Sequence, residues 1–425
     1  MELLEKVLNA QNLADATNAV LANKVAGGVD KLSVEQFKEK YERGEINFEE
    51  IKELIRKRKY DPLPVRRVYI PKENGDKRGL GIPTIMDRII QQAISQVLTP
   101  IYEEQFGETS YGFRPGRSCE MAIIKALEIF NDGYNWIVDI DLEKFFDNVC
   151  HDKLISIIMK TIHDGELVSL IRKYLKAGIM ENGVVIKTTK GTPQGGNISP
   201  LLSNIMLNEL DKELDKRNLH YVRYADNCLI MVKSEKAANR VMETITKFIE
   251  KKLGLKVNVS KSKIARPKDI KYLGLGFYQN ENEIFRPKPH LKSIQKFKRK
   301  LKQITKRNRG VAVTQLFKEL NAVIRGWINY FRIADMKMIM QEITSHLNRR
   351  IRCYIWKQWK TCNHRIKCLM KLGISENKAR RTAYSRASYW HNSKSVVIHV
   401  AISNKRLKQK GLLLPIDHYL KVHKV

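Results

Sequence analysis

Residues 220–232, HYVRYADNCLIMV, decide how the middle of this chain folds. Two short apolar runs, 221–224 and 228–232, flank the polar tip Ala225-Asp226-Asn227. This pattern predicts a β-hairpin, because Asp and Asn tolerate the backbone angles of a tight turn. Most such hairpins have no chemical role, but a rigid turn can also hold an acid against a metal ion. Asp226 is therefore a candidate metal ligand, and the amide that follows it needs an explanation.

A second acid, Asp141, ends the apolar run WIVDID at residues 136–141. Carboxylates at the ends of neighbouring strands can share divalent cations, and two such ions can activate a 3′-hydroxyl and stabilise a leaving pyrophosphate. Mg²⁺ prefers hard oxygen ligands of this kind, and nucleotide phosphates can complete its coordination. Two strand-end aspartates alone are weak evidence, since Asp is also a common turn former.

Three further segments favour a nucleotide site around these acids. Phe146, in DLEKFFD, could stack under a sugar. The loop GTPQGGN at residues 191–197 provides flexible backbone for close approach to a substrate. Lys72 and Arg78 lie on a predicted hairpin at residues 64–83, where two cations can clamp a phosphate. On the residues alone, solvated hairpin charges and core phenylalanines explain the same positions equally well.

The chain has 425 residues, 43% of them hydrophobic, and a net charge of +33, which suits two or three globular domains. Residues 286–425 contain 34 Lys and Arg but only 5 Asp and Glu. A solvated basic surface rarely needs such an excess, so we predict a polyanionic partner. No apolar run is long enough to cross a bilayer, and no signal peptide is expected. Six cysteines without a CxxC pair indicate reduced thiols and a cytoplasmic location, and the resemblance named below implies a bacterial one.

The remaining pattern alternates helices with short strands to about residue 285 and is helical and basic beyond it. Two prolines and the shift of charge at residues 286–290, RPKPH, mark the predicted domain boundary. Helices are predicted within 1–60, at 86–105, after Ser199-Pro200 and at 234–253, and short strands at 136–141 and within 256–264 and 271–279.

In chain order these segments resemble one family, the reverse transcriptases encoded by group II introns, also called intron maturases. The resemblance runs over nearly the whole chain and is strongest to the compact bacterial members without an endonuclease domain. It implies an α+β right-hand polymerase. Fingers and an antiparallel palm sheet would occupy 1–285, with an N-terminal extension at about 1–60, and a helical thumb or maturase (X) domain 286–425. The segments that carry it are NKVAGGVDKLS, RRVYIPKENGDKRGLGIPTIMDRIIQQAI, SYGFRPGRS, DIDLEKFFDNVCHDKL, GTPQGGNISPLLSNIMLNELD, YADN, KVNVSKSK, YLGLGF and IRGWINYF.

The resemblance implies a role for each matching residue. Asp141 and Asp226 would bind two Mg²⁺ ions, with Mn²⁺ as an alternative and the backbone carbonyl of Leu142 as a further ligand. Lys261 lies where a lysine protonates the leaving pyrophosphate, although Lys263 is an equal candidate on sequence.

Other implied roles concern the incoming deoxynucleotide and the primer. Lys72 and Arg78 would grip the triphosphate, and the backbone N–H groups of Lys144 and Phe145 would bind its phosphates. Phe146 would be the aromatic gate that rejects a 2′-hydroxyl, and Gln194 would line the nucleotide pocket. The turn Leu273-Gly274 would grip the primer.

The family pattern at the hairpin tip is Tyr-x-Asp-Asp, and Asn227 departs from it. The amide keeps the shape and one carbonyl oxygen but loses a charge. At ~4 Å and an effective dielectric of about 20 that charge contributes about 4 kcal/mol before desolvation is subtracted. Three interpretations stay open: a natural residue with activity retained, a natural copy whose polymerase has decayed, or an engineered change that silences the site. Because the other motifs are intact, we favour retained but weakened activity.

The segment HLNRRIRCYIWKQWK at residues 346–360 interleaves basic and aromatic residues, which suits phosphate contact and base stacking. By resemblance this part would hold the template–primer duplex and bind the structured intron RNA. The predicted RNA-binding residues are Arg349, Arg350, Arg352, Lys357 and Lys360.

The sequence therefore predicts an RNA-directed DNA polymerase that also binds group II intron RNA and assists its splicing and retromobility. Its predicted partners are that RNA, an RNA template, a DNA primer and dNTPs. Two alternatives stay open: a splicing maturase with little or no DNA synthesis, and a repair polymerase derived from the family. The intact nucleotide-binding set favours the enzyme, while Asn227 and the basic C-terminal third are compatible with the splicing cofactor.

Overall fold

The computed structural model describes residues 2–23, 26–71 and 75–423 of the chain. They form two compact units, Met1–Arg266 and Pro267–Val425. The predicted boundary near residue 286 falls inside the second unit, on the strand Phe285–Pro289. Among the described residues, no helix has the length and apolar character needed to cross a bilayer.

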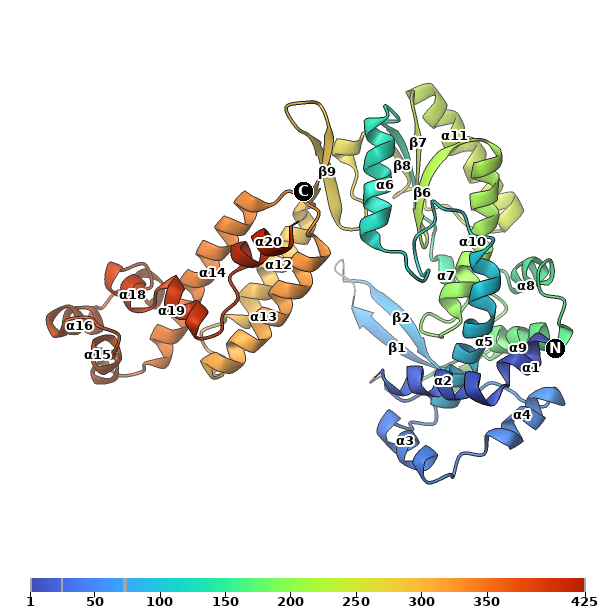
Figure 1. Cartoon of the computed structure of the whole chain (residues 1–425), viewed down its shortest axis with the longest axis horizontal. Helices are drawn as coiled ribbons and strands as arrows, with labels where there is room; N and C mark the ends of the chain where they lie inside the picture. The colour runs from blue at the N-terminus through green and yellow to red at the C-terminus, as the bar shows by residue number, and fades with distance from the viewer. Residues whose placement is uncertain (1, 24–25, 72–74, 424–425) are drawn as a thin grey trace. The chain divides into compact units, whose positions relative to one another are not determined.

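The centre of the first unit is a four-stranded antiparallel sheet in the order β6-β7-β3-β8 (Figure 1). The predicted hairpin is its β6-β7 pair. The turn between them consists of Ala225 and Asp226 only, and Asn227 already belongs to β7. The strands are β3 (Trp136–Ile140), β6 (His220–Tyr224), β7 (Asn227–Val232) and β8 (Lys263–Ala265).

The register of this sheet brings the two predicted acids to one edge. Ile140 on β3 lies opposite Cys228 on β7. One further step sets Asp141, which follows β3, opposite Asn227, with Asp226 next to it in the turn. Residues that lie directly opposite each other on paired antiparallel strands project to the same face, which is the case for Asp141 and Asn227 when the register continues by one step.

Three helices pack against this sheet: α6 (Cys119–Asn131) and α10 (Ser199–Lys216) against β6, and α11 (Glu235–Phe248) against β3 and β7. The inner strands are consequently buried on both faces, as the exposed fractions of 0% for Val138, Leu229 and Ile230 indicate. Burial on both faces explains why β7 is continuously apolar from Cys228 to Val232 instead of alternating, while β3 has one polar residue, Asp139.

A second sheet of the first unit has the order β2-β1-β4-β5. Its β1-β2 hairpin is the predicted one at residues 64–83, and β1 pairs in parallel with β4. The strands are β1 (Val65–Pro71), β2 (Lys77–Ile82), β4 (Ile179–Glu181) and β5 (Val184–Ile186). The other helices of this unit are α1 (Leu3–Val7), α2 (Ala10–Leu21), α3 (Val34–Glu42), α4 (Phe48–Arg56), α5 (Ile85–Glu103), α7 (Phe145–Asn148), α8 (His151–Met159), α9 (Gly165–Lys176) and the π-helix Ile249–Leu253.

The second unit begins with a short 3₁₀ turn and a hairpin and continues as helices. Helices α12, α13, α14 and α20 pack together around buried residues such as Leu320 and Ile351, both 0% exposed. The elements are β9 (Leu275–Gln279), β10 (Phe285–Pro289), α12 (Leu291–Ile304), α13 (Val313–Tyr330), α14 (Lys337–Gln358), α15 (Cys362–Lys371), α16 (Glu376–Ala383), α17 (Tyr389–Asn392), α18 (Val396–Ala401), α19 (Asn404–Gln409) and α20 (Pro415–Val422).

A buried ion pair joins the β6-β7 hairpin to α10. The guanidinium of Arg223 donates to both carboxylate oxygens of Asp211, through Nε at 2.7 Å and through Nη2. Its Nη1 donates to Asn204 Oδ1 at 3.1 Å and to the Ala225 carbonyl at 3.0 Å. Arg223 and Asp211 are both 0% exposed. The pair therefore fixes the turn that carries Asp226.

The charges of Arg223 and Asp211 compensate each other in the interior of the protein. Burial alone would lower the pKa of Arg223, but the charge and hydrogen bonds of Asp211 raise it above the usual arginine value. Arg223 thus stays charged in the protein interior, where an unpaired charge would be very costly.

We expect Asp211→Asn to destabilise the protein strongly, because it leaves the guanidinium of Arg223 buried without a counter-charge. Removing one partner of a buried pair typically costs about 3–5 kcal/mol. Thermal unfolding should show a large fall in Tm. The matched control is Glu243→Gln, which breaks the exposed ion pair with Lys247 and should leave Tm unchanged. Equal Tm values for the two variants would contradict this role of Asp211.

Candidate active site

Asp141 is held by the loop that precedes β8. Its backbone N–H donates to Ser262 Oγ at 3.1 Å, and its carbonyl accepts from the Asn258 N–H at 2.8 Å. The sequence predicted a strand within 256–264, but only its end belongs to β8. The rest is a loop that wraps around the end of β3 and contacts both sides of the Asp141 peptide.

The same loop brings Lys261 to the first acid. Lys261 Nζ lies 3.4 Å from Asp141 Oδ1. Lys263 instead acts on Asp139: burial raises the pKa of Asp139 to about 6, while the charge of Lys263 lowers it. The structure therefore separates two lysines that were equal candidates on sequence, and it is Lys261 that contacts Asp141.

Asp226 interacts with the other charged groups of the site. Burial raises the pKa of Asp226 and the charge of Asp141 raises it further, whereas Arg78 and Lys261 lower it. These interactions place two acids and two cations around the hairpin tip. The carboxylates repel each other, so the site gains stability from any additional cation between them.

Asn227 lies exposed at the start of β7. Its Nδ2 donates to Asp226 Oδ1 at 3.5 Å, a long hydrogen bond. An aspartate at this position would repel the Asp226 carboxylate, whereas the amide donates to it. Compared with an aspartate at position 227, the amide therefore lowers the total negative charge of the site and also lowers the repulsion on the Asp226 carboxylate.

Hydrogen bonds connect the β1-β2 hairpin to the glycine-rich loop at residues 191–197. Arg78 Nε on β2 donates to Gln194 Oε1 at 2.8 Å, and the Gly81 N–H donates to the Gln194 carbonyl at 2.8 Å. A side chain at Gly195 would place its Cβ 2.5 Å from the Gly81 carbonyl oxygen, so this approach requires glycine. The structure thus brings Arg78 and Gln194 together, while Lys72 lies outside the described residues.

A cavity of ≈ 400 Å³ lies between this hairpin, the loop and α7. Phe146, whose carbonyl accepts from the Thr192 N–H at 2.7 Å, forms part of its wall. Phe145 is buried against Phe146 with ring centroids 5.2 Å apart, so its side chain belongs to the core. Lys144 has a left-handed backbone, with φ of 45°, just before α7. Residues that line the cavity include Arg67, Tyr69, Lys77, Lys144, Phe146 and Gln194.

The residues of the acid pair fit divalent cations. Asp141 and Asp226 are partly buried and close enough for the charge of one to shift the pKa of the other. Among the residues described, no group of three or more His, Cys, Asp or Glu side chains is arranged to hold a metal. Two acids would therefore leave coordination positions for the Leu142 carbonyl, water and substrate phosphates, which is a pattern that Mg²⁺ favours.

Several residues that position the site were not predicted from the sequence. They are Arg223, Asp211 and Ser262, together with Gly112, whose carbonyl accepts from Asn204 Nδ2 at 2.8 Å. The only sequence signal was Arg223 among the apolar and aromatic residues of β6, because Asp211 is one of several charged residues on α10. A buried polar residue in such a segment needs a partner, but the sequence does not say which one.

In the second unit, Leu273 and Gly274 form a tight turn just before β9. Both have positive φ, 48° and 83°. The Leu273 carbonyl accepts from the Tyr330 hydroxyl at 2.9 Å, and the Gly274 carbonyl accepts from Ser293 Oγ at 2.8 Å. The turn is therefore held by α13 and α12, and its role as a primer grip remains a prediction.

The five basic residues predicted to bind RNA differ in their surroundings on and after α14. Lys357 and Lys360 are exposed, and Arg349 and Arg350 are half-buried. Arg352 is only 4% exposed, and its guanidinium donates to the Ile402 carbonyl at 2.9 Å and to Asn404 Oδ1 at 2.8 Å. For Arg352 the predicted RNA contact is therefore wrong: its side chain anchors the segment before α19 to α14.

The comparisons with known proteins agree with this geometry. The reverse transcriptase (RNA-dependent DNA polymerase) family matches residues 70–277, and the group II intron maturase-specific domain matches residues 294–373. Protein YkfC of Escherichia coli K12 is 34% identical over 307 residues, which cover 63% of this chain and 80% of that protein.

Two further relatives match over shorter segments. The group II intron-encoded protein LtrA of Lactococcus lactis is 49% identical over 168 residues, 39% of this chain and 28% of LtrA. A putative COX1/OXI3 intron 2 protein of Saccharomyces cerevisiae is 30% identical over 270 residues, 50% of this chain and 32% of that protein. The chain belongs to the family of group II intron reverse transcriptases and maturases, and its fold is of the right-hand polymerase type.

We expect Gly112→Ala to displace the hairpin tip, because the added Cβ would lie 2.2 Å from the Ala225 nitrogen. Overpacking of this kind typically costs about 1–3 kcal/mol, so Tm should fall. Gly165→Ala is the matched control in the same unit, since nothing lies within 4 Å of its Cβ position and its φ is not positive. A Tm for Gly112→Ala equal to that of the control would show that the tip tolerates the methyl group.

Proposed function

We propose that this chain is an RNA-directed DNA polymerase that transfers deoxynucleotides to a primer at Asp141 and Asp226. The observation that carries the proposal is the convergence of both acids with Lys261 and Arg78 at one edge of the central sheet. Nucleotidyl transfer requires acids that bind divalent ions and cations that bind the phosphates of the nucleotide, and both kinds of side chain are present here.

The residues of the site divide the work of the reaction. Mg²⁺ or Mn²⁺, held by Asp141, Asp226 and the Leu142 carbonyl, would supply activation of the primer hydroxyl and charge neutralisation of the leaving pyrophosphate. Arg78, fixed by Gln194, orients the triphosphate, and Lys261 donates a proton to the departing pyrophosphate. The ring of Phe146, at the wall of the cavity, excludes a ribose 2′-hydroxyl by steric contact.

We propose a second role for the basic part of the chain, the binding of group II intron RNA. Residues 286–425 have only 5 acidic residues against 34 Lys and Arg, and the maturase-specific match falls within them. Phosphate binding of this kind needs positive charge and rigid helices, and it does not depend on the acids of the polymerase site. Fingers and palm would then lie in 1–285 and the thumb or maturase domain in 286–425.

One observation favours a second candidate function. Asn227 removes a negative charge beside Asp226, which weakens the attraction for divalent ions. A splicing maturase without DNA synthesis is the function that remains if this loss abolishes the polymerase.

Primer extension on an RNA template tests the proposal, in Mg²⁺ and separately in Mn²⁺. We expect the unmodified chain to extend the primer and Asp226→Ala to be inactive, because one carboxylate cannot replace the pair. Asp132→Ala, an exposed aspartate after α6, is the control and should extend normally. Asn227→Asp should extend at lower Mg²⁺ concentration than the unmodified chain, since it restores a charge at the metal site.

Two outcomes would contradict the proposal. Extension by Asp226→Ala at the unmodified rate would show that the acid pair is not the catalytic site. Extension by Asn227→Asp alone would assign the second candidate function, an RNA-binding maturase, to the chain as it stands.

A further inference from the structure

The second unit has a cavity of ≈ 590 Å³ where the segment just after α12, the C-terminal part of α14 and the short helix α17 meet. Ligand sites for small molecules commonly measure roughly 300–1,000 Å³, so one nucleotide fits this volume. No acidic residue lines the cavity. Its lining residues are Thr305, Lys306, Arg307, Asn308, Arg350, Cys353, Lys357 and Trp390. We call it the basic aromatic pocket.

Positive charges converge beside this pocket on the ring of Tyr389. Lys357 Nζ lies 4.9 Å from the ring centroid, and the guanidinium carbons of Arg365 and Arg307 lie at 5.3 and 5.5 Å. A hydrogen bond from Arg365 and the charge of Lys357 lower the pKa of the Tyr389 phenol.

Among the described residues, no carboxylate forms an ion pair with Arg307, Lys357 or Arg365. Within the described part of the second unit, the ion pairs use other basic residues, such as Lys298 with Glu342 and Arg309 with Glu319. The aromatic ring offers them only its face and its hydroxyl. An anion that enters the pocket would therefore relieve the repulsion among Arg307, Lys357 and Arg365.

Trp390 provides a flat apolar surface next to these cations. The Arg349 guanidinium stacks on its ring at 3.8 Å from the centroid, and Arg349 Nη2 donates to the Trp390 carbonyl at 3.0 Å. Ser388 caps the short helix that carries Trp390, by accepting from the His391 N–H. The ring is therefore held in place before any ligand arrives, which lowers the entropic cost of stacking a base on it.

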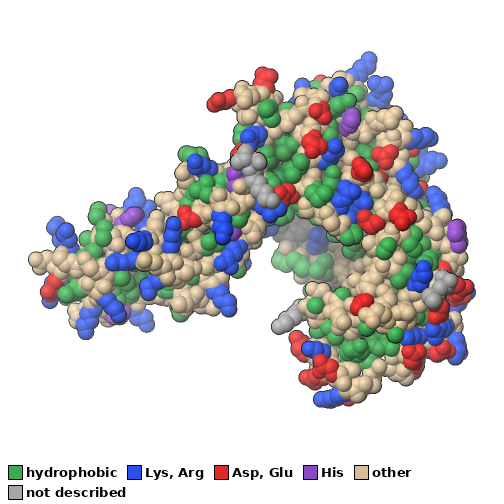
Figure 2. All heavy atoms as spheres, in the orientation of Figure 1, with side chains coloured by type: hydrophobic (Ala, Val, Ile, Leu, Met, Phe, Trp, Pro, Cys, Tyr) green, Lys and Arg blue, Asp and Glu red, His purple; other side chains and the backbone are tan. Residues whose placement is uncertain are grey.

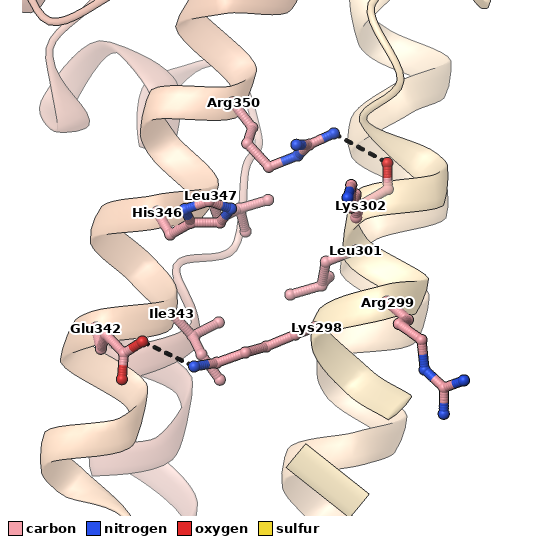
Figure 3. A pocket seen from close by; sticks show the side chains of 9 residues that line it. All are labelled: Lys298, Arg299, Leu301, Lys302, Glu342, Ile343, His346, Leu347 and Arg350. Atoms are coloured by element: carbon pink, nitrogen blue, oxygen red, sulfur yellow. Dashed lines mark hydrogen bonds and ion pairs between the residues drawn. The ribbon is translucent and has the colours of Figure 1, made fainter. Parts of the chain in front are cut away.

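Next to the pocket, α12 and α14 are cross-linked around a neighbouring cavity, as Figure 3 shows. Lys298 on α12 reaches Glu342 on α14 at 2.7 Å, and Arg350 on α14 donates to the Lys302 carbonyl on α12 at 3.0 Å. A second cavity of ≈ 250 Å³ between these helices shares Arg350 with the pocket, and His346 from its lining lies 5.8 Å from Trp390, ring to ring. Figure 2 shows Lys and Arg side chains scattered over the visible face of the second unit. A chain of phosphates can thus continue from the pocket along α12.

We propose that the basic aromatic pocket binds one unpaired nucleotide of an RNA strand, with the base against Trp390 and its phosphates on Arg307 and Lys357. A duplex hides the faces of its bases, whereas an unpaired base can leave the stack and lie on an aromatic ring. The inference rests on the proposed RNA partner and names what the protein recognises in it: a nucleotide outside the helical regions.

Fluorescence anisotropy with a labelled short oligouridylate tests the proposal, with a blunt-ended RNA duplex and a polyglutamate peptide as competitors. Trp390→Leu should weaken binding of the single strand by about tenfold, the range of one base stacked on an aromatic ring, and leave the affinity for the duplex unchanged. Tyr384→Leu is the matched control, because Tyr384 is 60% exposed in the same unit and does not line the pocket.

Arg307→Gln tests the phosphate contact separately from the stacking on Trp390. Because Arg307 is exposed, we expect this change to leave the fold intact. It should weaken single-strand binding and lower the salt slope by about 0.7 for one phosphate. Lys378→Gln, an exposed lysine on α16, is its control and should keep both values. Trp390→Phe, which retains a ring, should restore most of the affinity lost in Trp390→Leu and so separates stacking from a folding defect.

The proposal is overturned if Trp390→Leu binds the single strand as tightly as Tyr384→Leu does. It is also overturned if binding of the single strand and binding of the duplex weaken equally, or if polyglutamate displaces RNA as well as the oligouridylate does. These assays contain no dNTP and can be repeated on Asp226→Ala. If the pocket does not bind RNA, the primer-extension result is unaffected. If the chain does not extend primers, the dependence of RNA binding on Trp390 can still be measured.

Discussion

A buried guanidinium–carboxylate pair, Arg223 with Asp211, is the constraint on which the rest of the polymerase site depends. The Arg223 guanidinium donates both to Asp211 on α10 and to the Ala225 carbonyl in the turn before Asp226. The turn itself is strained, since Ala225 has a φ of 55°. A non-glycine residue holds that backbone only when its surroundings fix it, and here Arg223 and the close approach of Gly112 do so.

The charges of the site follow from this fixed turn. With Asp226 held beside Asp141, the acids repel each other, and burial adds to the cost of ionising Asp226. Lys261 and Arg78 reduce that cost from two directions, one from the loop before β8 and one from the β1-β2 hairpin. Asn227 fits this balance, because its amide donates to Asp226 where a second acid would add repulsion. The cost of the amide is a weaker attraction for cations, which is the physical reason to expect a higher requirement for Mg²⁺.

Much of this arrangement could be predicted from the sequence, and the rest has a definite physical reason. The hairpin around Asp226 and the strand before Asp141 were readable because apolar runs and turn residues are local signals. The contact of Arg78 with Gln194 joins residues far apart in the chain, and the family resemblance, not the local pattern, brought the two together. The partner of Arg223 was not readable, because nothing local distinguishes a buried arginine from an exposed one. Arg352 shows the same limit from the other side: a basic residue among aromatics suggested RNA contact, but it packs inside its unit.

The most direct test of this account is the double variant Arg223→Met, Asp211→Leu, measured for both Tm and the rate of single-nucleotide extension. Replacing a buried ion pair by apolar residues of similar volume is often neutral for stability, so Tm should stay well above that of Asp211→Asn, although the Asn204 and Ala225 oxygens lose their donor. The donor to the Ala225 carbonyl is gone, however, and misplacing a catalytic group by about 1 Å can cost roughly a hundredfold in rate. The account predicts a stable protein that extends primers far more slowly than the unmodified chain. A stable double variant that extends at the unmodified rate would contradict it, because the turn would then hold Asp226 in place without the pair.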